Sequence, residues 1–69
     1  MKRLYWVTSG EMAESVYADS VEDAARTALR TTKAKTFGLL MQVREYSPRE
    51  DWYLLTENVC KEIGWKQEA

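Results

Sequence analysis

The stretch DSVEDAARTALR, residues 19–30, decides how the chain folds. Ser20 can cap a helix that starts near Val21, and the acidic residues that follow suit the positive N-terminal end of a helix. Ser20 and Asp23 have the spacing of a capping box, with Asp in place of the usual Glu or Gln. The apolar positions follow the spacing of one helix face and are Val21, Ala24, Ala25, Ala28 and Leu29. The stretch therefore predicts an amphipathic helix.

Alanines dominate the apolar face of this helix, so the helix must lie close to the surface that it covers. A sheet with large side chains is the natural complement to such a face. Residues 3–8 and 12–18 are rich in aromatic and β-branched types, and a short turn with Gly10 separates them. This pattern predicts a β-hairpin that precedes the helix.

A second hairpin is predicted after the helix. Residues 37–46 form the strongest strand pattern in the chain, and we expect their alternate apolar residues to face the helices. These residues are Phe37, Leu39, Met41 and Val43. Residues 47–51 contain the only proline and predict a turn. Trp52 to Leu55 then predicts a fourth strand.

The last predicted element is a short helix. Thr56 is its candidate N-cap, and Gly64 suits the left-handed residue that ends a helix. Its apolar stripe consists of Val59, Cys60 and Ile63. Leu55 before the helix and Trp65 after it are expected to fold onto this stripe and bracket the helix at both ends.

The predicted fold class is α+β, a single small domain over residues 1–69 in the order ββαββα. The sheet is mainly antiparallel, and the helices pack on one of its faces. The chain has 69 residues, of which 45% are hydrophobic and 30% are charged, with a formal net charge of -1. A domain of this size has a free energy of unfolding of roughly 3 to 10 kcal/mol. The three Trp and four Tyr residues are therefore expected to be core residues first, because their burial stabilises so small a domain.

The composition argues against catalysis, cofactors and metal ions. The chain has no His and one Cys, which excludes an internal disulfide and a Cys/His zinc site. The carboxylate pairs Glu22-Asp23 and Glu50-Asp51 fall at a helix start and a turn, where acidic residues are expected anyway. Cys60 lies on an apolar stripe with no His to activate it, so it is expected to be a buried core thiol. We therefore expect a protein that is not an enzyme.

The sequence also predicts where the protein works. Lys2 and Arg3 precede an apolar run of only four residues, Leu4 to Val7, which is too short for a signal peptide. No stretch approaches the 18 or more apolar residues of a membrane span. One unpaired Cys without a spacing pattern suits a reducing compartment. We therefore expect a cytoplasmic protein with no membrane partner.

Charge is segregated along the chain. Residues 10–25 carry acidic side chains and no basic one, whereas residues 26–44 carry basic side chains and no acidic one. The basic residues are Arg26, Arg30, Lys33, Lys35 and Arg44. One hypothesis is a nucleic-acid-binding module that uses this basic block. The alternative is compensation of the helix dipole plus a solvated loop, and the net charge of -1 favours it.

The second functional hypothesis concerns the sheet face that the helices leave open. This face is expected to carry more apolar surface than a monomer usually exposes. The candidate interface residues are Tyr5, Tyr17, Leu40, Tyr46 and Tyr53. The sequence thus favours a non-catalytic protein-interaction module, of the regulator, inhibitor or assembly-factor type. Its partner is expected to be another protein or a second copy of the chain, with a homodimer favoured.

Overall fold

The computed structural model describes residues 2–46 and 49–64. Its elements follow the predicted order ββαββα and confirm the α+β fold class. They are β1 (Arg3–Ser9), β2 (Met12–Ala18), α1 (Val21–Thr31), β3 (Leu40–Tyr46), β4 (Arg49–Leu55) and α2 (Thr56–Ile63).

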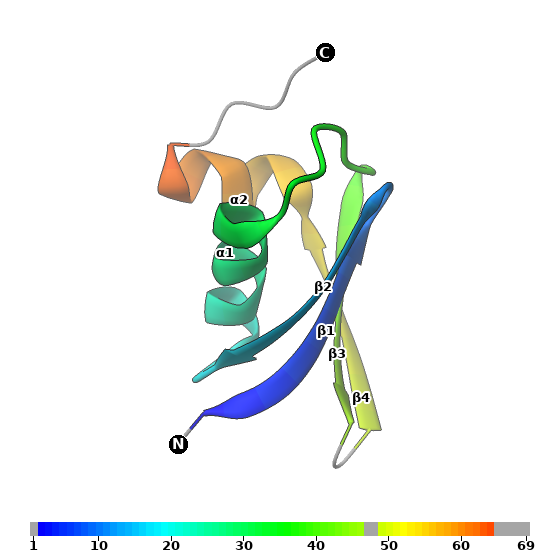
Figure 1. The fold of residues 1–69 in the computed structure, drawn as a ribbon, viewed down its shortest axis with the longest axis vertical. Helices are drawn as coiled ribbons and strands as arrows, with labels where there is room; N and C mark the ends of the chain where they lie inside the picture. The colour runs from blue at the N-terminus through cyan, green and yellow to red at the C-terminus, as the bar shows by residue number, and fades with distance from the viewer. Residues whose placement is uncertain (1, 47–48, 65–69) are drawn as a thin grey trace.

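The four strands form one antiparallel sheet in the order β2-β1-β3-β4. Each hairpin pairs its own strands, and β1 with β3 joins the two hairpins at the centre of the sheet. Both helices lie on the same side of the sheet (Figure 1). We call the covered side the inner face and the opposite side the outer face.

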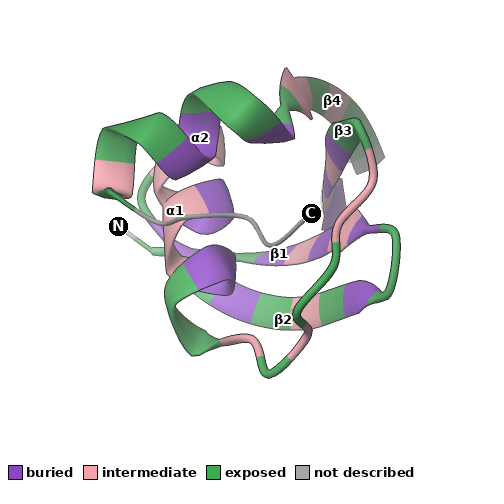
Figure 2. Cartoon of the chain, turned by 90° about the horizontal axis from the view of Figure 1, so that it is seen from above, coloured by how far each residue is buried: buried purple, intermediate pink, exposed green. Residues whose placement is uncertain are grey.

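The core lies between the inner face and the helices. Buried positions recur at alternate residues of β1, β2 and β3, and the inward residues of β4, Trp52 and Leu54, are half-buried. The buried parts of both helices turn toward the strands (Figure 2). The largest fully buried side chains are Met12, Leu29, Met41, Val7, Val43 and Thr56. Helix α1 behaves as predicted, because the Ser20 hydroxyl accepts a 3.1 Å hydrogen bond from the Asp23 N–H. Its three inward alanines are completely buried, so α1 packs closely on the sheet.

The strand predicted over residues 37–46 begins later, at Leu40. The preceding backbone is engaged outside the sheet, since the Gly38 N–H donates to Ser9 Oγ and the Leu39 carbonyl accepts from the Thr56 N–H. Leu39 therefore does not face the helices as predicted, and its side chain is 78% exposed. Phe37 is half-buried and packs against the core from the loop rather than from a strand.

The start of α2 also differs from the prediction. Leu55 is its N-cap and makes no side-chain capping bond, whereas Thr56 is the first helical residue. Thr56 does not cap because its hydroxyl lies 3.1 Å from Ser9 Oγ in a hydrogen bond. The Ser9 hydroxyl also donates to the Leu40 carbonyl over 3.0 Å. One buried side chain on β1 thus fixes the starts of β3 and α2.

The remaining boundaries show one correction and one confirmation. Residues 49–51, predicted as part of a turn, belong to β4 and pair with β3. Gly64 ends α2 in the left-handed conformation, with φ of 70°, as predicted. Val59 and Cys60 are buried and Ile63 packs against the core, which confirms the predicted stripe. Trp65, expected to fold onto that stripe, lies outside the described residues.

Gly10 turns the first hairpin with φ of 58°. Its backbone lies against the loop before β3, so a Cβ added at Gly10 would stand 2.7 Å from the Gly38 nitrogen. A Cβ at Gly38 would in turn stand 3.2 Å from the Gly10 nitrogen. The two glycines therefore permit a close backbone approach that places the Ser9 hydroxyl within reach of its partners.

Candidate protein-interaction surface

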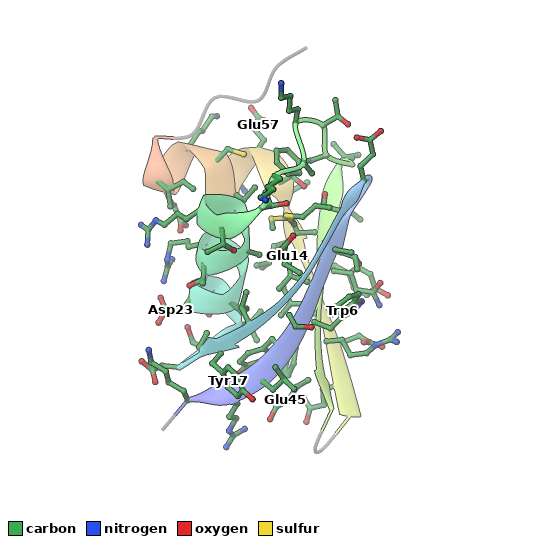
Figure 3. The ribbon with its side chains drawn as sticks, viewed as in Figure 1. Trp6, Glu14, Tyr17, Asp23, Glu45 and Glu57 are labelled. Atoms are coloured by element: carbon green, nitrogen blue, oxygen red, sulfur yellow. The ribbon has the colours of Figure 1, made fainter. Side chains whose placement is uncertain are left out.

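Strand register determines which side chains lie on the outer face. Residues opposite one another on neighbouring strands share a face, and the buried residues occupy the alternate positions. The described outer-face residues of β1 and β2 are Leu4, Trp6, Thr8, Ala13, Ser15 and Tyr17. Those of β3 and β4 are Leu40, Gln42, Arg44, Asp51, Tyr53 and Leu55. Figure 3 shows Trp6 on the side of the sheet away from the helices.

Large apolar side chains gather in two parts of the outer face. Leu4 pairs with Tyr17, whose side chain is 66% exposed. Leu40 pairs with Leu55, and Tyr53 lies next to them with 62% of its side chain exposed. Tyrosine is enriched at protein interfaces because its ring offers a large contact area at low entropic cost. The structure thus brings three of the predicted interface residues, Tyr17, Leu40 and Tyr53, onto one surface.

The prediction for Tyr5 is wrong, because Tyr5 lies on the inner face and is only 3% exposed. Its ring meets Trp52 edge to face at a centroid distance of 6.4 Å. Burial, with the nearby Glu45 carboxylate as the second cause, raises the pKa of the Tyr5 hydroxyl. Val7, in the same alternate set of β1, is completely buried. Tyr46 belongs to β3, but its side chain lies outside the described part of the chain.

Leu4, Trp6 and Leu55 are outer-face residues that the sequence analysis did not select. Both alternate sets of β1 are apolar, so the strand alone does not reveal which set is buried. The register of the first hairpin does reveal which set of β1 is buried. The two-residue turn after Ser9 places Tyr5 opposite Val16, in the set of β2 that also holds Met12 and is buried.

Only two charged side chains lie among the described outer-face residues, and they have opposite sign. Arg44 Nε donates to Asp51 Oδ1 over 2.7 Å, across the register of β3 and β4. Both side chains are about one-third exposed, at 29% and 34%. Arg49, which stands opposite Tyr46 in the same register, is a third charged position on this face.

The structure divides the predicted basic block. Arg26 lies on α1 and pairs with Asp23 and, at 2.8 Å, with Glu62 of α2. Hydrogen bonds to Asp23 and then to Glu62 raise the pKa of the Arg26 guanidinium. Arg44 lies across the sheet from α1, on the outer face. The exposed basic residues that stay together near the end of α1 are Arg30, Lys33 and Lys35.

Two of the carboxylates considered for catalysis form ion pairs. Asp23 and Asp51 each take part in an ion pair, with Arg26 and Arg44 respectively. Within residues 2–46 and 49–64, no group of three or more Cys, Asp or Glu side chains is arranged to hold a metal ion. Neither described helix has the length and apolar character needed to cross a membrane.

Comparison with known protein families, with curated proteins and with solved structures finds no significant match.

Cys60 lies in the core with 5% of its surface exposed, and burial raises the pKa of its thiol. A raised folded-state pKa favours the neutral thiol. The associated stability is complete below the pKa of the unfolded chain and is lost as pH rises through the folded-state pKa. Near pH 8 the folded protein therefore holds little reactive thiolate in an inaccessible place.

We expect native Cys60 to react with a disulfide reagent such as DTNB at least about 100-fold more slowly than Cys60 of the urea-unfolded chain. Absorbance of the released thiolate at pH 8 measures both rates. Equal rates in the native and unfolded proteins would contradict the buried position.

Proposed function

We propose that this chain is a non-catalytic protein-interaction module that self-associates through its outer face. The observation that carries the proposal is the exposure of Leu4, Tyr17, Leu40, Tyr53 and Leu55 on one sheet face. Exposed apolar surface of this kind, here in two parts of one sheet face, is typical of a binding site. A cytoplasmic location is part of the proposal, supported by the lone buried thiol of Cys60.

Nucleic-acid binding, the alternative function, has weaker support. Of the five basic residues considered for it, Arg26 is engaged by two carboxylates, and Arg44 lies on the other side of the sheet. Arg30, Lys33 and Lys35 remain together, which is a small electrostatic footprint for a domain with a net charge of -1.

The proposal predicts that the protein dimerises in a concentration-dependent manner and that apolar outer-face residues drive the association. Leu40→Thr combined with Tyr53→Thr removes apolar surface but keeps side chains that suit strands. We expect this double variant to weaken the dimer at least about tenfold. Its free energy of unfolding should change by no more than about 1 kcal/mol, since both side chains are substantially exposed.

Sedimentation equilibrium over a dilution series measures the monomer–dimer constant of each protein. Leu39→Thr is the matched control, because Leu39 is the most exposed of the large apolar residues described but precedes β3. This control should dimerise like the wild type. A wild-type monomer at every concentration tested would contradict self-association, and equal dimerisation of all three proteins would place the contact elsewhere.

A further inference from the structure

The sheet has two edge strands that differ in their side chains. In the part of the chain that the structure describes, the order β2-β1-β3-β4 leaves β2 and β4 each paired on one side (Figure 2). An edge strand presents backbone N–H and C=O groups to which a further strand can bind. Whether such pairing is favourable depends on the side chains that the added strand would cover.

β2 carries an inward charge at its centre. Glu14 lies opposite Val7, which is completely buried, so the Glu14 side chain belongs to the inner face. A strand added beside β2 would cover this half-buried carboxylate. Inward charges of this kind protect edge strands against unwanted pairing. The edge at β2 is therefore a poor site for a further strand.

β4 lacks such protection over its last four residues. Its charged residues are the first three, whereas residues 52–55 have the sequence WYLL. Trp52 and Leu54 are half-buried on the inner face, and Tyr53 and Leu55 are exposed on the outer face. A strand added at this end of β4 would thus cover aromatic and aliphatic side chains on both faces of the sheet.

One hydrogen bond fixes which backbone groups of β4 point to the open edge. The Thr56 N–H donates to the Leu39 carbonyl over 3.1 Å, in the same register that pairs β3 with β4. Along an antiparallel strand, residues that bond one neighbour alternate with residues that point away from it. Leu54 therefore turns its N–H and C=O groups to β3. Tyr53 turns its N–H and C=O groups, and Leu55 its N–H, to the open edge.

A second copy of β4 fits this edge. Two identical strands can pair antiparallel about a two-fold axis perpendicular to the sheet, which closes both open edges in one contact. The contact is continuous with the surface proposed for self-association, because Tyr53 and Leu55 belong to the outer face. A second copy also supplies the same aromatic and aliphatic strand end that this edge presents.

Side-chain pairing selects the position of the axis. An axis at Glu50 or Asp51 would set like carboxylates opposite each other, which destabilises a strand pair. An axis at Trp52 would set Glu50 opposite Leu54 of the second copy. An axis at Tyr53 pairs the two tyrosines on the outer face, and it pairs Trp52 with Leu54 of the second copy on the inner face. An axis nearer the end of β4 would pair fewer strand residues.

We propose that two copies of this chain join by antiparallel pairing of their β4 strands about Tyr53. The inference rests on the proposed function, since it names the strand contact by which the chain self-associates. The two sheets become one continuous sheet, with the helices of both copies on the same side. The outer faces of the two copies also become continuous.

Leu55→Pro tests the backbone contact. The φ of Leu55 is -71°, close to the fixed φ of proline, and its N–H points away from β3, so the substitution suits the folded chain. It removes an N–H that donates to the second copy. Leu55→Thr is the matched control, because it also removes the leucine side chain but keeps this N–H.

We expect Leu55→Pro to weaken the dimer at least about tenfold more than Leu55→Thr, since two hydrogen bonds of the symmetric contact are lost. Sedimentation equilibrium measures the monomer–dimer constants. Circular dichroism and the midpoint of urea unfolding establish that both variants are folded to the same extent.

Tyr53→Cys tests the position of the axis. Residues opposite each other in an antiparallel pair lie at a Cα distance that a disulfide can span, so copper phenanthroline in air should link two copies through Cys at this position. Tyr17→Cys is the matched control, because Tyr17 has a similar exposure on the same face but lies on β2. Denaturing electrophoresis without reductant should show cross-linking of Tyr53→Cys at least about tenfold faster. The wild type, whose Cys60 is buried, gives the background.

The outcomes separate this inference from the function on which it rests. If the two Leu55 variants dimerise equally, or if Tyr17→Cys cross-links as fast as Tyr53→Cys, pairing of β4 with β4 is wrong. Loss of dimer in Leu40→Thr with Tyr53→Thr would still support the apolar face in that case. A monomeric wild type would overturn both proposals.

Discussion

Gly10→Ala is expected to lower the free energy of unfolding by about 2 to 5 kcal/mol, a large part of what a domain of this size has. Two costs add. The φ of 58° is unfavourable for any residue with a Cβ. The new methyl group would also stand 2.7 Å from the Gly38 nitrogen and 2.9 Å from the Phe37 carbonyl carbon. These are backbone atoms, so the hairpin and the loop must separate to admit it.

Gly64→Ala is the control for the conformational cost alone. Gly64 has φ of 70°, but a Cβ there would meet no atom within 4 Å. We expect a loss of about 1 kcal/mol. Urea unfolding followed by tryptophan fluorescence compares the two variants. Equal losses would show that the close approach of Gly10 to Gly38 has no energetic role.

Tyr5→Ala is the second substitution with a large expected effect, about 3 to 5 kcal/mol, in the range of a buried aromatic residue replaced by alanine. The change empties a site that is 3% exposed and removes the edge-to-face contact with Trp52. It also leaves a cavity over the centre of the sheet, where β1 meets β3. Because the domain is small, a substantial fraction of the variant should be unfolded at 37 °C.

Tyr17→Ala provides the matched comparison on the same hairpin. Tyr17 is 66% exposed on the outer face, so we expect its loss to cost no more than about 1 kcal/mol. Chemical denaturation measures both variants, and sedimentation measures their association. If Tyr5→Ala were as stable as Tyr17→Ala, Tyr5 would belong to the surface, as its sequence alone suggested.

Local sequence signals correctly predicted the helix ends and the strand face that depend on neighbouring residues. Ser20 and Asp23 define the start of α1 through a contact between residues three apart, and Gly64 marks the end of α2 through its own backbone conformation. The alternation of Met41 and Val43 correctly assigned the inner face of β3. In each of these cases the necessary information lies within a few residues.

Long-range contacts explain what the sequence did not reveal. Leu39 leaves the strand pattern because its carbonyl accepts from the Thr56 N–H, and Thr56 does not cap because its hydroxyl bonds Ser9. Tyr5 was misplaced because both alternate sets of β1 are apolar. The sequence could therefore predict that the candidate interface is an apolar sheet face. Which residues belong to that face could be known only from the register between the strands.

The central position of β1 bears on how the chain folds while it is synthesised. β1 is the first of the described strands, yet it pairs with β2 on one side and with β3 on the other. Until the ribosome has delivered β3, which begins at Leu40, one edge of β1 has no hydrogen-bonding partner. Unpaired edges invite pairing with foreign strands. Early pairing of β3 with β1 therefore protects the nascent chain from aggregation at this edge of β1, which is fully paired in the folded domain.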